Sequence, residues 1–170
     1  PLLAGEKARC QDLPLYLKTD THWTPAAMEL TAEKLAEAVR RAVTLPPPMA
    51  GRFTSAEKAV TNSGDVAMML KLPAGRRETA YPPETVRVKQ IMDGKGQCRP
   101  DPAGEVLLLG DSFANIYSLD LMGWGESAGL AEQLSFRIGR PVDAIVRNSD
   151  GAWATREVLR QQLARGWDRL

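Results

Sequence analysis

Ser112 is the residue in this sequence that is best placed to act as a nucleophile. It follows a continuous apolar run, Val106 to Leu109, with the length of a buried strand, and it stands beside Asp111 before a helix-compatible stretch. In parallel sheets, reactive side chains gather just beyond the carboxyl ends of the strands. Backbone N–H groups at the start of a helix would also stabilise negative charge near the Ser112 hydroxyl. The pattern therefore predicts a strand, a sharp turn and a helix that present a nucleophilic serine.

His22 is the single histidine of the chain, so its imidazole is the one that could activate Ser112 as a general base. Asp20 precedes it by two residues in the segment TDTHWTP. In an extended segment, residues two apart project to the same side, so both side chains could reach the same edge of the sheet. A carboxylate that accepts a hydrogen bond from Nδ1 holds an imidazole in the tautomer that leaves Nε2 free for a serine hydroxyl. Asp20, His22 and Ser112 therefore supply the side chains of a serine triad.

Each of these residues also has a purely structural explanation. Asp and Ser are common at the N-terminal cap of a helix, which would account for Asp111 and Ser112. A lone histidine is more often a satisfied surface or core residue than a base. The catalytic interpretation depends on both motifs occurring together, and on a local turn that lets Asp20 reach the imidazole.

The motifs resemble those of a known family. The segments DTHW at Asp20 to Trp23, GDVAMMLKLP at Gly64 to Pro73 and GDSF at Gly110 to Phe113 are similar to segments of the alginate O-acetyltransferases, the AlgJ and AlgX group, within their SGNH-hydrolase-like domain. Ordinary SGNH esterases carry the serine block first, so the order here matches the permuted acetyltransferase branch. The resemblance spans most of the chain. It implies that Ser112 is the nucleophile and His22 the base, oriented by the aspartate of DTHW.

The resemblance also implies a reaction and a cellular location. It implies transfer of acetyl groups, through an acetyl-serine, to hydroxyl groups of an exopolysaccharide such as alginate in the periplasm. The implied partners are the polysaccharide acceptor, an acetyl donor that is a small ester or an acylated protein, and an exopolysaccharide biosynthesis complex. No cofactor is expected. Two alternatives stay open: an SGNH carbohydrate acetyl esterase with water as the acceptor, and a catalytically inactive polysaccharide-binding or scaffold domain.

The composition is that of an ordinary folded domain. The chain has 170 residues, of which 44% are hydrophobic and 25% charged, and its formal net charge is +1. A domain of this size buries about two-thirds of its unfolded surface, so we predict one domain over residues 1–170, which the resemblance implies is SGNH-hydrolase-like. The small net charge argues against a nucleic-acid partner, and no apolar run reaches the ~18 residues of a membrane span. Because the first residue is Pro, we expect some N-terminal sequence to be missing.

The two cysteines, Cys10 and Cys98, both lie in polar, loop-like sequence. Two exposed thiols are a liability in an oxidising compartment, so we expect a disulfide between them. Spacing alone leaves two unrelated thiols as an alternative. One histidine and two distant cysteines do not have the spacing of a structural zinc site, so no metal is expected.

The apolar patterns predict an α/β fold, a three-layer sandwich with a mostly parallel sheet. The segments expected to form strands are Leu13 to Lys18, Glu84 to Met92 at a sheet edge, Val106 to Leu109 and Val142 to Val146. The segments expected to form helices are Pro25 to Ala42, Asp65 to Leu72, Leu130 to Ile138 and Ala152 to Ala164. The segments expected to be irregular are Gly51 to Gly64, Ala74 to Pro83 and Asp93 to Ala103.

Two loops could complete the site. The turn after the strand at Val142 to Val146 carries Arg147, Asn148 and Gly151 to the sheet edge expected for the nucleophile. There an amide side chain or a glycine N–H could complete an oxyanion hole, as an Asn and a Gly do in the SGNH family, although such residues are usually plain turn residues. Trp124, in a glycine-rich loop, and Arg147 are candidates for contacting the acceptor.

Overall fold

The computed structural model describes residues 2–9 and 14–165. Its helices are α1 (Leu2–Arg9), α2 (Pro25–Ala42), α3 (Asp65–Met69), α4 (Ala74–Ala80), α5 (Ser112–Asn115), α6 (Leu130–Ile138) and α7 (Gly151–Ala164), with a 3-10 turn at Asp120–Met122. Its strands are β1 (Phe53–Asn62), β2 (Glu84–Asp93), β3 (Gly96–Gln97), β4 (Val106–Gly110) and β5 (Val142–Val146).

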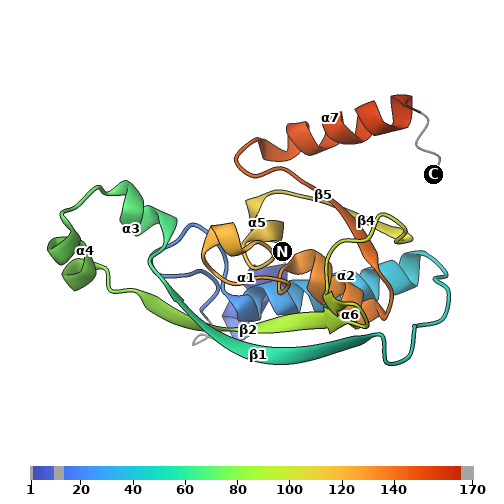
Figure 1. The fold of residues 1–170 in the computed structure, drawn as a ribbon, viewed down its shortest axis with the longest axis horizontal. Helices are drawn as coiled ribbons and strands as arrows, with labels where there is room; N and C mark the ends of the chain where they lie inside the picture. The colour runs from blue at the N-terminus through green and yellow to red at the C-terminus, as the bar shows by residue number, and fades with distance from the viewer. Residues whose placement is uncertain (1, 10–13, 166–170) are drawn as a thin grey trace.

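The elements are stacked in layers (Figure 1). Strands β1, β2 and β3 form an antiparallel sheet, and α2 and α6 pack against each other beside it. The α6 helix also contacts β5, while α7 contacts β4 and β5 from the other side (Figure 1). The β4–β5 pair is therefore the middle of a helix, sheet, helix arrangement, and the predicted α/β class is confirmed.

The parallel pair positions the two loops expected at the site. Val106 of β4 faces Val142 of β5, and the register runs without a break to Gly110 and Val146. Both strands therefore end at one edge, where the backbone N–H of Arg147 donates to the carbonyl of Gly110 at 3.2 Å. The predicted bounds of both strands are confirmed to within one residue. Among the described residues this is the one parallel pair, so the expectation of a mostly parallel sheet applies only here.

The antiparallel sheet corrects the predicted irregular connection at Gly51 to Gly64. Within it, β1 pairs with β2 along its whole length, from Phe53 opposite Asp93 to Asn62 opposite Glu84. Most side chains of β1 are exposed on both faces, so its sequence lacks the apolar alternation that marks a half-buried strand. Because β1 and β3 flank β2, the predicted edge strand is central. It contributes Val88 and Ile91 to the core.

The helices mostly match their predictions. The side chain of Thr24 caps α2 by accepting a hydrogen bond from the N–H of Ala27, and α6 ends at Gly139 as expected. The prediction of a loop at Ala74 to Pro83 is wrong, because α4 forms over its first seven residues. Ala, Arg and Glu favour a helix strongly enough to outweigh the single Gly75. No helix within the described ranges is long and apolar enough to cross a membrane.

Cys98 lies in the interior rather than in an exposed loop. Its thiol is free and the residue is only 1% exposed. Burial raises the pKa of this thiol to about 12. The expected disulfide is therefore not formed. It was expected because exposed thiols are easily oxidised, and this reason does not apply to a thiol shielded from solvent. Cys10 lies outside the described residues.

Candidate active site

Asp20 and His22 lie in a tight loop that precedes α2. The N–H of Leu17 donates to the carbonyl of His22 at 3.0 Å, and Tyr16 forms an isolated bridge with Trp23. This pairing folds the chain back on itself, so the strand predicted for Leu13 to Lys18 is reduced to one bridge, with Leu13 outside the described residues. The local turn on which the catalytic interpretation depended is therefore present.

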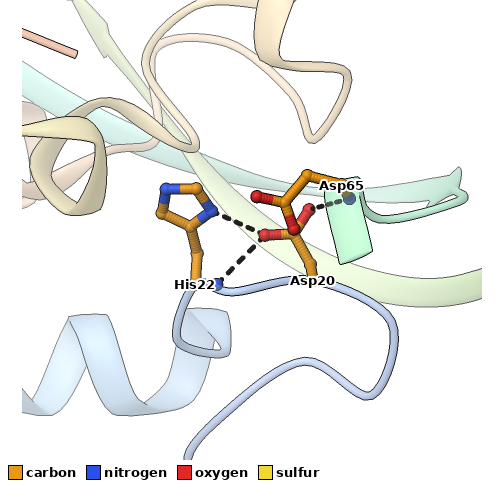
Figure 2. Close-up of side chains that lie close together, drawn as sticks. All are labelled: Asp20, His22 and Asp65. Carbon is orange, nitrogen blue, oxygen red and sulfur yellow. Dashed lines mark hydrogen bonds and ion pairs between the residues drawn. The ribbon is translucent and has the colours of Figure 1, made fainter. Parts of the chain in front are cut away.

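The loop brings the Asp20 carboxylate against the His22 imidazole (Figure 2). Nδ1 of His22 lies 2.6 Å from Oδ1 of Asp20, and the backbone N–H of His22 donates to the same oxygen at 3.0 Å. Both residues are buried. Because an ionised carboxylate can only accept, the proton in this contact belongs to Nδ1. In the neutral imidazole, Nε2 on the far side of the ring is then the acceptor.

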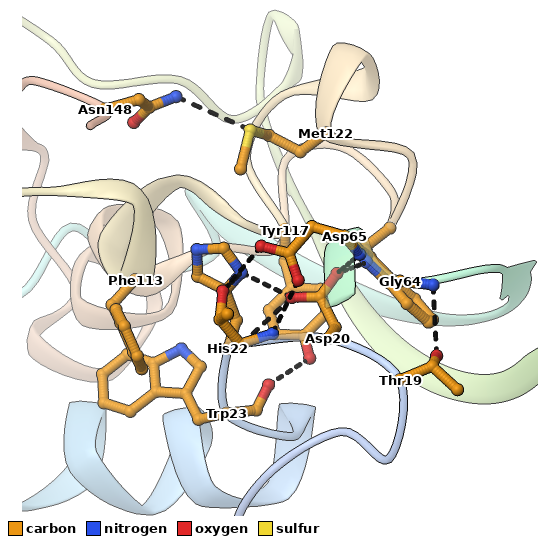
Figure 3. Close-up of polar contacts among 12 residues, drawn as sticks. Thr19, Asp20, His22, Trp23, Gly64, Asp65, Phe113, Tyr117, Met122 and Asn148 are labelled. Atoms are coloured by element: carbon orange, nitrogen blue, oxygen red, sulfur yellow. Dashed lines mark hydrogen bonds and ion pairs between the residues drawn. The ribbon is translucent and has the colours of Figure 1, made fainter. Parts of the chain in front are cut away.

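The second oxygen of Asp20 accepts two hydrogen bonds of its own, one of them from Asp65 (Figure 3). Its Oδ2 accepts from the backbone N–H of Asp65 at 3.1 Å and from Nε1 of Trp124 at 2.9 Å. Burial acts to raise the pKa of Asp20, but the hydrogen bonds from His22, Asp65 and Trp124 outweigh it and lower the pKa to about 2. Asp20 is therefore an anion at neutral pH.

Carboxylates from two other segments hold the loop in place. Glu84 of β2 accepts hydrogen bonds from the backbone N–H groups of Lys18 and Thr19, at 3.1 and 3.0 Å. Asp65 accepts from the N–H and the hydroxyl of Thr21, at 2.8 and 2.7 Å. The loop is thus fixed at its base by the antiparallel sheet and at its tip by α3.

Ser112 is the first residue of α5, at the carboxyl end of β4, and is half-buried. Asp111 caps this helix by accepting from the N–H of Phe113 at 3.0 Å, so the structural explanation accounts for Asp111. The Phe113 ring lies against His22, with 5.0 Å between ring centroids, and edge-on to Trp23 at 5.6 Å. The imidazole therefore packs on the neighbour of the predicted nucleophile.

Asp20, His22 and Asp65 lie close enough together for their side chains to share a metal ion. Each offers a ligand atom within 4.8 Å of the others (Figure 2). However, Nδ1 of His22 is bonded to Asp20, and the Asp65 carboxylate is bonded to Thr21. Hydrogen bonding accounts for these atoms, so we assign the cluster as a hydrogen-bond network.

Comparison with known proteins identifies the family to which the chain belongs. A family model described as "SGNH hydrolase-like domain, acetyltransferase AlgX" matches residues 3–165. The chain belongs to this AlgX family. Two curated relatives are both called "Probable alginate O-acetylase AlgJ". The relative from Pseudomonas fluorescens is 29% identical over 113 residues, 64% of this chain and 29% of the relative. That from Pseudomonas putida KT2440 is 41% identical over 66 residues, 39% of this chain and 16% of the relative.

Two solved structures share the fold of this AlgX-family chain. The O-acetyltransferase domain of Pseudomonas putida AlgJ aligns with a TM-score of 0.66 and 21% identity, covering 94% of this chain and 51% of that one. Pseudomonas aeruginosa AlgX aligns with a TM-score of 0.53 and 18% identity, covering 81% and 30%. The chain thus spans about half or less of the length of each of these relatives.

Asn148 and Arg147 follow β5 in this AlgX-family chain, as predicted, and meet different partners. Nδ2 of Asn115, in α5, donates to Oδ1 of Asn148 at 3.1 Å, and the Asn148 amide donates to the sulfur of Met122 at 3.6 Å (Figure 3). Arg147 forms an exposed ion pair with Asp150 at 2.8 Å. Gly151, the other residue named for an oxyanion hole, is exposed at the start of α7.

Trp124 corrects the prediction of an acceptor contact. Its side chain is 0% exposed, so no face of the ring is available to a sugar. The ring instead donates to Asp20 from inside the core. A tryptophan between two glycines suggests an exposed loop, and nothing in the local sequence reveals that this loop is covered.

A cleft of about 370 Å³ separates α7 from the turn that carries Ser112. Gly110, Asp111 and Phe113 line one side of it, and Arg156 of α7 lies on the other. One turn earlier on α7, Trp153 is 76% exposed. The sequence predicts Arg156 only as part of a solvated helix face, because the cleft depends on how α7 is placed against β4.

Proposed function

We propose that this chain is an O-acetyltransferase that moves an acetyl group, through an acetyl-serine on Ser112, to hydroxyl groups of an exopolysaccharide such as alginate. The observation that carries the proposal is the buried Asp20–His22 hydrogen bond of 2.6 Å. The imidazole of this pair packs against Phe113, the residue that follows Ser112 in the chain. The names of the relatives, alginate O-acetylases, support the choice of acyl group and acceptor.

The proposed reaction has two displacements. In the first, Oγ of Ser112 attacks the acetyl carbonyl carbon of the donor ester while Nε2 of His22 takes the hydroxyl proton. The donor C–O bond breaks, and His22 returns the proton to the leaving oxygen. In the second, Nε2 takes the proton of a sugar hydroxyl, whose oxygen attacks the acetyl-serine. The Ser112–acetyl bond breaks and Oγ regains a proton, so the enzyme returns to its starting state.

Both displacements pass through an oxyanion that needs hydrogen-bond donors. We propose Asn148 or the N–H of Gly151 for this task, together with the N-terminal turn of α5. The contact from Asn115 supports Asn148, because it holds the carbonyl end of the amide and so fixes where the NH₂ end points. A weak sulfur acceptor on Met122 at 3.6 Å leaves donor capacity on that NH₂ group.

The acceptor is proposed to lie across α7. Trp153 offers an exposed ring face on which a sugar can stack, and Arg156, one helical turn away, can pair with a uronate carboxylate. The cleft beside Arg156 runs to the Ser112 turn, so a sugar bound on α7 would lie near the nucleophile. Arg147, which is exposed, is the other residue that the sequence suggests for contacting the polysaccharide. A periplasmic location, a donor ester or acylated protein and membership of an acetylation complex belong to the same proposal.

The proposal is tested by following two products separately. The purified protein is incubated with an acetyl ester, with and without unacetylated alginate, while free acetate and sugar ester are both measured. An acetyltransferase yields sugar ester and less acetate per ester consumed, because water and sugar compete for one acetyl-serine. Ser112→Ala should abolish both products, whereas Ser55→Ala, on the exposed strand β1, should abolish neither.

Two results would contradict the proposal in different ways. An acetate yield that does not change over a wide range of alginate concentration would indicate an esterase. Absence of both products, with a folded circular dichroism spectrum, would indicate an inactive binding or scaffold domain.

A further inference from the structure

Two buried tryptophans in one core cluster differ in the bonding of their indole N–H groups. Trp23 and Trp124 both belong to the cluster that also contains Tyr117 and Met28. Nε1 of Trp124 donates to Oδ2 of Asp20 at 2.9 Å, whereas Nε1 of Trp23 is buried with no partner among the described residues. Trp23 therefore contributes to the core by packing alone, whereas Trp124 also makes a specific hydrogen bond to Asp20.

We infer that Trp124 is a positioning residue that holds the Asp20 carboxylate in the orientation required by His22, an inference that rests on the proposed function. A carboxylate can rotate about its Cβ–Cγ bond, and a partial rotation would turn both oxygens away from the imidazole. Trp124 and the backbone N–H of Asp65 both bind Oδ2. This leaves Oδ1 facing Nδ1 of His22, as Figure 2 shows. The imidazole is thereby kept in the tautomer whose Nε2 accepts a proton.

The backbone around Trp124 is built to hold the ring in this place. Gly123 and Gly125 on either side have φ values of +76° and +115°, a region that side chains with a Cβ rarely adopt. A Cβ on Gly123 would also displace the side-chain amide of Asn62 on β1. The loop is thus shaped to turn the indole inward rather than to leave it at the surface.

The same loop is tied to the segment that follows Ser112. The N–H of Ala128 donates to the carbonyl of Tyr117 at 2.9 Å, and the Tyr117 hydroxyl donates to the carbonyl of Trp23 at 2.6 Å. Trp124 therefore belongs to a connected frame that joins the nucleophile segment to the Asp20 loop. A shift of the indole would move the carboxylate relative to the serine side of the site.

The decisive experiment uses the single histidine of the chain as a spectroscopic probe. Protein labelled with ¹⁵N-histidine gives one imidazole spectrum, so no assignment is needed. When the imidazole is neutral, we expect the wild-type protein to show a protonated Nδ1 and an unprotonated Nε2. Trp124→Phe, which removes the N–H and keeps an aromatic ring, should give a mixture of tautomers. Trp23→Phe makes the same change at the unbonded tryptophan and should keep the wild-type spectrum.

Turnover of a small acetyl ester provides the second readout. Trp124→Phe should lower kcat about 10- to 100-fold, the size expected for losing a hydrogen bond to a charged group, and leave KM unchanged. In an Asp20→Ala background the same substitution should cause little further loss, because its partner is already absent. An equal loss of kcat in both backgrounds would overturn the inference.

The spectra separate this inference from the proposed function. If the protein has no acetyl-transfer activity, the histidine spectra still test the positioning role. Wild-type-like tautomers in Trp124→Phe would overturn it, whatever the activity. Should Trp124→Phe not fold, the indole N–H resonance of Trp124 is compared in wild-type and Asp20→Ala protein. A resonance that does not move would show that the bond is absent, and a shift confined to Trp124 would support it.

Discussion

Ser118 donates a hydrogen bond from its hydroxyl to Oε2 of Glu132 at 2.7 Å, inside the protein. Burial raises the pKa of Glu132 above its ordinary value of 4.5, against the smaller opposing effect of the Ser118 bond. A raised carboxyl pKa means that stability is lost as pH rises from the unfolded-state value through the folded-state value. The charged form of Glu132 therefore costs stability at neutral and alkaline pH.

Glu132→Gln should stabilise the protein at pH 8, because the amide keeps an acceptor for Ser118 and carries no charge. The gain should disappear below about pH 4.5, where the wild-type carboxyl is neutral in both states. Urea unfolding at pH 4 and pH 8 measures the difference, with the exposed Glu33→Gln as control. A gain of equal size at both pH values would show that the effect does not come from ionisation.

Asp20 should have the opposite pH dependence. Its pKa is lowered to about 2, so its contribution is complete above the unfolded value of 3.8 and is lost as pH falls through 2. The shift corresponds to about 2 kcal/mol. Urea unfolding of wild-type protein between pH 5 and pH 2 should show this loss, and Asp20→Asn should lack that part of the slope. Parallel pH profiles for the two proteins would contradict the assignment.

Ser112→Ala and His22→Ala should each lower ester turnover at least ~10³-fold, and the double variant should be hardly slower than either, because triad members act as a unit. Asp20→Asn should be less severe, since it disturbs the tautomer and leaves the base in place. Steady-state kinetics with one acetyl ester compares the four variants with the wild type. Fully additive losses for Ser112 and His22 would mean that the two residues do not cooperate.

Trp153→Ala and Arg156→Gln should raise KM for alginate about 5- to 10-fold, since each removes one exposed contact worth roughly 1 kcal/mol. Turnover of a small ester without polysaccharide should stay as in the wild type. The effect of Arg156→Gln should shrink in high salt because an exposed ion pair is screened. Arg76→Gln in α4 serves as the matched control. If that control raises KM as much as Arg156→Gln, attraction of the polyanion by general surface charge would explain the result.

Cys98 should resist alkylation in the native protein, because burial raises its pKa to about 12 and keeps the thiol protonated. A Cys10→Ser variant isolates this residue. Mass spectrometry after iodoacetamide treatment should find no label on the native variant and one label after unfolding in urea. Rapid labelling of the native variant would show that the thiol is accessible.

The elements that could be predicted from the sequence are those whose own residues carry the pattern of a buried strand or a capped helix. The apolar runs of β4 and β5 and the capping pair Thr24 and Pro25 at α2 carry their own signals, and the structure follows them. The β1 strand has no such signal, because its polar side chains face solvent and only pairing with β2 makes it a strand. The formation of β1 therefore depends on its tertiary pairing with β2.

The candidate site divides in the same way. The types and spacing of Asp20, His22 and Ser112 are visible in the sequence because a serine triad requires those side chains. The support from Trp124 and the cleft beside Arg156 are not visible, since both depend on how distant segments pack. A local reading assigns Trp124 to an exposed loop, and only the fold places its indole beside the carboxylate.

The bonds that converge on the Asp20 loop join residues far apart in the chain. Asp65 is 45 positions from Asp20, and Trp124 is 104 positions away. Contacts of such long range form late in folding, because closing long loops costs entropy before any contact is gained. A growing chain on the ribosome therefore carries Asp20 and His22 without the residues that hold them. The proposed acetyl transfer would therefore require a chain that has been synthesised and folded at least as far as Trp124.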